Sequence, residues 1–273
     1  MHYITLMAAV TAAWTFGLAA SYSANIIDFN TWTEVQDPPH AGMTSNVDSA
    51  SQVTLTASGA IPAGTDIGYQ SVNGTDVSSS SSGHYFSTGA DFQVAIDFDL
   101  MAANSVGLGG IGFGIGEDSA GTNSAGVALA ILNGSPTLYS GAARVNDVTQ
   151  APLTLALSAS STGRFFVHYD SANGDITVGV SNTPGALTPD ATNTFSGANV
   201  QNNWAGDDLL VSFFLRSDSV VFPPLSAGTL EVVFSNFEVL SGTSIAVPEP
   251  GSAALCIIGM MLLRFRSTHE WFF

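Results

Sequence analysis

Apolar and polar residues alternate with a period of two along most of the chain, and this pattern limits the possible folds more than any other feature. Alternating runs occupy residues 92–98, 153–158 and 175–180, and more continuously apolar segments occupy 209–215 and 230–240. Clusters of Gly, Asn, Asp, Ser and Pro separate these segments, and none of them has a convincing helical period. The sequence therefore predicts an all-β fold, a single β-sandwich or jelly roll, over residues 25–243.

The charge of the chain narrows the range of ligands. The 273 residues carry a formal net charge of −17, with five basic and 22 acidic residues, and lysine is absent. Such a chain repels phosphate backbones, which argues against a nucleic-acid partner. The acidity is typical of solubility outside the cell, although Ca²⁺ or contact with cationic or neutral polymers is an alternative explanation. The single cysteine, Cys256, leaves residues 25–243 without a disulfide or a thiolate metal site.

The N-terminal segment, residues 1–24, has the pattern of a signal peptide. An apolar run from Ile4 to Ala20 is followed by small residues that satisfy a small-x-small cleavage rule. Only His2 provides polarity before the run, so an uncleaved anchor and a buried first helix remain alternatives. The rest of the chain has the pattern of strands, which argues against a buried first helix. We therefore expect a signal peptide and export.

The C-terminal segment, residues 244–273, combines three ordered features. Pro248, Glu249 and Pro250 come first, then an apolar run at 253–263, then Arg264 and Arg266. Eleven apolar residues span only about 17 Å as a helix, against about 30 Å of bilayer hydrocarbon. The arginines place their end in the cytoplasm, so we expect a short transmembrane tail with transient inner-membrane retention.

This order of features resembles the PEP-CTERM sorting signal. The resemblance implies that Pro248, Glu249 and Pro250 are recognised by an exosortase-type processing enzyme, and that Arg264 and Arg266 flank the membrane segment. It also implies a protein of the cell envelope, the outer surface or the extracellular matrix, in bacteria that make extracellular polysaccharide and biofilm.

One hairpin is marked strongly in the sequence. The aromatic run 163–170 leads into Asn173-Gly174 and then into the β-branched run 175–180. Together with the closing run 233–239, this segment resembles concanavalin A-like lectin and glucanase domains. The resemblance implies a concanavalin A-like sandwich and a carbohydrate ligand.

A glycine-rich strand is predicted at residues 107–116. It formally matches the dinucleotide motif G-x-G-x-x-G, but its glycines alternate with Ile111, Phe113 and Ile115 and no helix follows. One face of the strand therefore has no side chains. That face either allows a neighbouring backbone to approach closely, which we favour, or forms a floor for a sugar.

The chain has no recognisable catalytic motif, so we expect it not to be an enzyme. Asp97 and Asp99 share one strand face and resemble paired carboxylates, but Ala95 stands where glucanases of this fold carry their first glutamate. A solvated polar face is the simpler interpretation of the two aspartates.

Two weaker sets of binding candidates remain. Trp204, Tyr139 and Trp32 are candidates for stacking on sugar rings if they are exposed, although burial is their default. Four acidic loop residues are weak Ca²⁺ candidates without a defined spacing: Glu117, Asp118, Asp207 and Asp208. No cofactor is expected otherwise.

Three functions are consistent with these observations. The leading hypothesis is an exported, non-catalytic protein of the cell envelope or extracellular matrix. The first alternative is a carbohydrate-binding, lectin-like module with a polysaccharide partner. The second is an atypical glycoside hydrolase or lyase.

Overall fold

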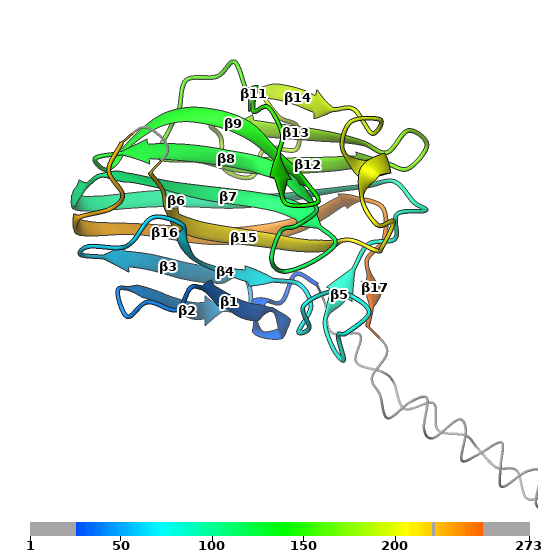
Figure 1. Cartoon of the computed structure of the whole chain (residues 1–273), viewed down its shortest axis with the longest axis horizontal. Helices are drawn as coiled ribbons and strands as arrows, with labels where there is room; N and C mark the ends of the chain where they lie inside the picture. The colour runs from blue at the N-terminus through cyan, green and yellow to red at the C-terminus, as the bar shows by residue number, and fades with distance from the viewer. Residues whose placement is uncertain (1–25, 220–221, 248–273) are drawn as a thin grey trace, which may run out of the picture.

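The computed structural model describes residues 26–219 and 222–247, and these residues form two antiparallel sheets that face each other (Figure 1). The predicted signal peptide at 1–24 and the tail features Pro248, Glu249, Pro250, Arg264 and Arg266 lie outside the described residues. Within the described ranges no helix has the length and apolarity needed to cross a membrane. The predicted all-β sandwich is confirmed.

Sheet A is the front layer of Figure 1. In spatial order its main path contains β1 (Thr33–Asp37), β4 (Thr65–Gln70), β15 (Leu210–Ser217), β7 (Leu108–Gly116), β8 (Ser124–Leu132), β9 (Ser135–Val145) and β10 (Val148–Thr149), and β11 (Leu153–Thr154) also pairs with β9. Strands distant in sequence are neighbours, so β15 lies between β4 and β7.

Sheet B is the rear layer. In spatial order it contains β14 (Ala191–Phe195), β13 (Asp175–Ser181), β12 (Thr162–Asp170), β6 (Phe92–Val106), β16 (Ala227–Ser241), β3 (Gln52–Ser58) and β2 (Met43–Ser49). A small third sheet pairs β5 (His84–Tyr85) with β17 (Ile245–Ala246). Two 3-10 turns complete the elements, η1 (Phe29–Thr31) and η2 (Gln201–Asn203).

The core lies between the inner faces of the two sheets and is rich in aromatic rings. Phe213 of β15 packs against Phe234 of β16, with ring centroids 4.6 Å apart. Phe98 and Phe165 stack at 4.4 Å within sheet B. The central strands contribute alternate residues to this core, which is why the period-two pattern predicts the fold.

The predicted hairpin at 163–180 is confirmed as β12 and β13, paired from Arg164–Ser181 to Asp170–Asp175. The run at 153–158 is different, because only Leu153 and Thr154 form a strand. Leu155 is nevertheless buried, and Leu153 and Leu157 pack against the core. Alternation there reflects burial of an irregular segment under the edge of the sandwich.

The packed part of the chain continues beyond residue 243, the boundary expected from sequence. Ile245 and Ala246 pair with β5, and the Val247 N–H donates to the Gly83 carbonyl at 2.9 Å. Val247 is buried against Val72 and Leu210. The strap formed by residues 245–247 therefore belongs to the folded body.

The serine run at 78–82 is held by hydrogen bonds to local side chains. The Asp76 carboxylate accepts from the Ser79 N–H at 2.7 Å. The Asn73 side-chain oxygen accepts from the Ser81 and Ser82 N–H groups. Local side-chain acceptors thus define the path of this loop.

Close approach of two backbones explains one pair of glycines in sheet A. Gly114 of β7 lies directly opposite Gly126 of β8. A Cβ atom on Gly114 would lie 2.7 Å from the Ala125 carbonyl oxygen and 3.1 Å from the Gly126 Cα. The interpretation favoured from sequence, close approach of a neighbouring backbone, therefore holds at this position.

We expect Gly114→Ala to lower the free energy of unfolding by about 1–3 kcal/mol, because backbone atoms must move to accept the methyl group. Gly110→Ala in the same strand is the matched control. Its Cβ would meet only the Leu129 carbonyl oxygen, at 3.4 Å, so its effect should stay within about 0.5 kcal/mol. Urea denaturation of both variants measures the difference, and equal losses would contradict the close-approach interpretation.

Candidate functional site

The outer face of sheet A carries a cavity of about 240 Å³, which we call the groove. Its floor is made of residues with little or no side chain, on the outward positions of the central strands. They are Gly68 of β4, Ser212 of β15, Gly114 and Gly116 of β7, Ser124, Gly126 and Ala128 of β8, and Ala142 of β9. The bare face of β7 therefore serves both interpretations made from sequence: it allows close backbone packing and it leaves open space above the sheet.

One aromatic ring lies on this floor. Phe214 of β15 is directly opposite Gly112 of β7, and its ring covers that glycine so closely that a Cβ on Gly112 would lie 2.5 Å from Phe214 Cζ. Its neighbours Phe213 and Leu215 point into the core and are fully buried, whereas Phe214 faces outward and is partly exposed. A partly exposed ring on an open floor provides an apolar surface for a ligand.

At one end of the groove a carboxylate, Asp66, faces a guanidinium group, Arg216. Asp66 of β4 is the cross-strand neighbour of Arg216 of β15 on one side and of Asp37 of β1 on the other. The distance from Arg216 Nη1 to Asp66 Oδ2 is 3.9 Å, longer than a hydrogen bond. Burial raises the pKa of Asp66 to about 6, with Arg216 lowering it and Asp37 raising it.

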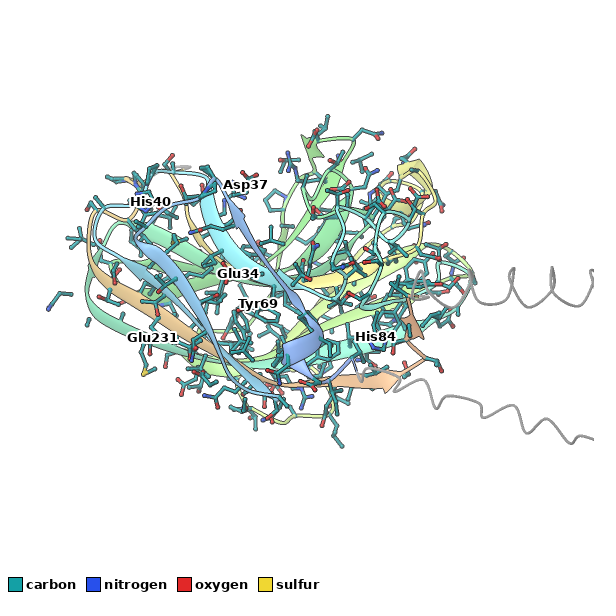
Figure 2. The ribbon with its side chains drawn as sticks, turned by 90° about the horizontal axis from the view of Figure 1, so that it is seen from below. Glu34, Asp37, His40, Tyr69, His84 and Glu231 are labelled. Carbon is teal, nitrogen blue, oxygen red and sulfur yellow. The ribbon has the colours of Figure 1, made fainter. Side chains whose placement is uncertain are left out.

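Figure 2 places Asp37 and His40 at one end of the sandwich and His84 at the opposite end. The Asp66–Arg216 pair belongs to the Asp37 end, because Asp37 and Asp66 are paired in register. Glu34 and Tyr69 lie further along the same strands, where the hydroxyl of Ser45 contacts both side chains.

Arg144 of β9 and Asp118 line the other end of the groove. Arg144 Nη2 forms an ion pair with Asp147 Oδ1 at 3.1 Å, and both side chains are well exposed. Asp118 Oδ1 accepts from the Thr122 N–H at 3.0 Å, as an acidic turn residue does. The groove is thus apolar in the middle and charged at both ends.

The three aromatic residues proposed from sequence for sugar stacking do not lie in the groove as exposed rings. Trp204 and Trp32 are each 7% exposed and Tyr139 is fully buried. Their polar atoms are bonded internally: Trp204 Nε1 donates to the Arg144 carbonyl at 3.0 Å, and Trp32 Nε1 donates to the Ile26 carbonyl at 2.8 Å. Burial, the default expected from sequence, is therefore confirmed for all three residues, and the stacking alternative is wrong because buried rings have no face to offer to a sugar.

Glu117, one of the four Ca²⁺ candidates, is an internal anchor. Its carboxylate is buried and accepts from the N–H groups of Ala205, Gly206 and Asp207 at 2.7–2.9 Å, and from Asn123 Nδ2 at 2.8 Å. Each oxygen accepts two hydrogen bonds, so all four of its lone pairs are used. The carboxylate ties the loop before β15 to the end of β7.

The other acidic candidates, Asp118, Asp207 and Asp208, do not gather around a shared centre. In the described part of the chain no three His, Cys, Asp or Glu residues are placed to hold a metal ion. Asp207 is exposed, and its backbone N–H is the donor to Glu117. The two acidic loops do meet, but through the backbone N–H groups of residues 205–207, which donate to Glu117.

Asp97 and Asp99 also differ from the expectation of a solvated face. Asp99 is exposed, but Asp97 is 3% exposed and lies 3.5 Å from the buried Nε of Arg164. Asp97 also accepts from the Gly185 N–H and from Asn236 Nδ2. The loop that contains Gly185 covers this part of sheet B, and Asp97 is used in holding it there.

The groove residues were missed in the sequence because they lie within an apolar run. Phe214 and Arg216 alternate with Phe213 and Leu215, which shows that they share the opposite face, but not that this face is open. One sequence signal could have identified these residues, the glycine face of β7. Glycines leave open space above a strand, so outward side chains on an adjacent strand are exposed toward that space.

No protein-family model matches the chain, and a search of curated proteins finds no match. Solved structures similar to the chain include a GH16 protein of a Bacteroides ovatus mixed-linkage glucan locus, at 12% identity and TM-score 0.46, covering 80% of this chain and 98% of that one. Lectin UEA-II complexed with galactose has 12% identity and TM-score 0.41, covering 76% and 92%. An alginate lyase from Klebsiella pneumoniae has 11% identity and TM-score 0.41, covering 74% and 84%. With TM-scores below 0.5, these similarities carry no conclusion about a site or an activity.

Glu117→Gln should lower the free energy of unfolding by about 2–4 kcal/mol, because the amide replaces acceptor lone pairs with donors that face other N–H groups. Asp207→Asn removes one negative charge at an exposed position of the loop that Glu117 holds, and it should change stability by less than about 0.5 kcal/mol. Thermal melts should not respond to Ca²⁺ or to a chelator. A melting temperature that Ca²⁺ raises in the original chain but not in Glu117→Gln would contradict the anchor role.

Proposed function

We propose that the protein is an exported, non-catalytic polysaccharide-binding protein of the cell envelope or extracellular matrix, and that it binds its ligand in the groove. The observation that carries this proposal is the partly exposed Phe214 ring on a floor of glycine and other small residues, with polar groups at both ends. Sugar rings present apolar C–H faces and a rim of hydroxyl groups, and such a ligand needs an apolar platform bordered by polar groups.

The spacing of the two carboxylates that line the groove, Asp66 and Asp118, supports binding in preference to hydrolysis. Glycoside hydrolases place two carboxyl groups about 5–10 Å apart across the bond that they cleave. Asp66 is opposite Arg216, and Arg216 is opposite Gly110 of β7. Asp118 follows Gly116, which is at the other end of β7. Six strand residues correspond to about 20 Å, so these two acids do not flank a single bond.

Phe214→Ala should weaken polysaccharide binding by about tenfold or more, because the apolar platform is lost. Phe222→Ala is the matched control: Phe222 is 46% exposed and does not line the groove. Isothermal titration calorimetry against a panel of soluble polysaccharides measures both variants. Equal binding by the two variants would place the ligand elsewhere, and release of reducing sugar that Asp66→Asn abolishes would identify an enzyme.

The export part of the proposal rests on the two ends of the sequence. The chain without a signal peptide at 1–24 should remain in the cytoplasm. Replacement of Pro248, Glu249 and Pro250 by alanine should leave an unprocessed, membrane-associated form, because the exosortase-type enzyme would no longer recognise its substrate. Cell fractionation and immunoblotting of the native host check this, and the same distribution for the altered and original chains would refute sorting by this motif.

A further inference from the structure

Basic side chains are scarce, and their positions are not random. The described residues contain three arginines and no lysine: Arg144, Arg164 and Arg216. Arg164 is 1% exposed and is paired with Asp97 and Glu238 in sheet B. Arg144 and Arg216 are 39% and 43% exposed, and both line the groove. Within the described ranges, the arginines that reach solvent are therefore the two in the groove.

We propose that the groove binds an anionic polysaccharide, with the guanidinium groups of Arg144 and Arg216 each binding a carboxylate or sulfate group of the polymer. This inference rests on the proposed polysaccharide binding and specifies its ligand class. Guanidinium groups form paired, charge-assisted hydrogen bonds with such anions, which makes arginine the side chain best suited to recognise them.

The separation of the two arginines favours a polymer over a single sugar. Arg216 is opposite Gly110 of β7, whereas Arg144 is opposite Ser124 of β8, which is itself opposite Gly116. The two positions are thus six residues apart along the strands and three strands apart across them. Strand geometry converts this offset to about 20 Å and about 14 Å. Each arginine must then contact a different sugar residue of one chain, with Phe214 two residues from Arg216 on the same strand.

The immediate surroundings leave Arg216 available to an incoming anion. Arg216 Nη1 lies 3.9 Å from Asp66 Oδ2, beyond hydrogen-bond distance, and the arginine side chain is 43% exposed. Asp66 itself faces two charged groups from the adjacent strands, Asp37 of β1 and Arg216 of β15. Because the pKa of Asp66 is raised to about 6, mild acid neutralises this competitor while a uronate or sulfate group keeps its charge.

The test uses polymers that share a backbone and differ in charge: dextran, carboxymethyl-dextran and dextran sulfate, with methyl-esterified and free polygalacturonate as a second backbone. The carboxymethyl and sulfate arms distinguish the two kinds of anion. Affinities of the full folded body are measured by isothermal titration calorimetry at about pH 7.5 and about pH 5, on either side of the Asp66 titration.

Four variants accompany the original chain. Arg144→Gln and Arg216→Gln each lower the net charge by one in the groove. Leu187→Glu lowers it by the same amount at a loop position that is 73% exposed and does not line the groove. Asp66→Asn removes the competing acid. Melting temperatures of all variants confirm that each is folded.

The original chain should bind an anionic polymer at least about tenfold more tightly than its neutral counterpart, and each arginine variant should lose about tenfold, while Leu187→Glu binds as before. Affinity should rise at about pH 5, and Asp66→Asn should bind equally well at both pH values. Equal affinity for neutral and anionic polymers would overturn this inference and leave polysaccharide binding intact. A preference for anions that the arginine variants do not reduce, or that Leu187→Glu reduces equally, would also overturn it. Failure to bind any polymer would remove the proposed function itself.

Discussion

The structure depends on a central strand that has side chains on only one face. In β7, Ile111, Phe113 and Ile115 fill the core, while glycines occupy the outward positions between them. Successive side chains of a strand point to opposite faces of the sheet, so a strand that alternates large apolar residues with glycine fills the core on one face and leaves the other face without side chains. The close contact of Gly114 with Gly126, the position of the Phe214 ring over Gly112 and the open groove all follow from this alternation.

Loops that look like binding sites in the sequence are used to hold the sandwich together. The buried Glu117 carboxylate collects three successive backbone N–H groups, and this fixes the loop that brings Trp204 against the carbonyl of Arg144. A buried carboxylate is stable only when its lone pairs are satisfied, and here they are satisfied by backbone donors. The polar groups of this region stabilise the fold and position the strand that carries Arg144.

The sequence predicts the parts of the structure that depend on local periodicity. The hairpin of β12 and β13 and the all-β architecture follow from alternation and from Asn173-Gly174. The groove could not be predicted, because it depends on which strands are neighbours: β15, late in the chain, is inserted between β4 and β7. The partner of Trp204 could not be predicted for the same reason, since its Nε1 donates to the carbonyl of Arg144, 60 residues away in the sequence.

The anionic polymer that we propose as the ligand of this acidic chain raises a conflict of charges, and the range of the forces resolves it. The net charge of −17 acts at long range, where salt at physiological strength screens it beyond about 8 Å. Recognition in the groove would act at hydrogen-bond distance, through Arg144 and Arg216 at its two ends, in competition with the carboxylates that lie beside them. For such a ligand, the surrounding acidity would oppose attachment at surfaces other than the groove. Added salt should therefore weaken the general repulsion more than the local contacts, which is the opposite of the salt dependence of a uniformly basic polymer-binding surface.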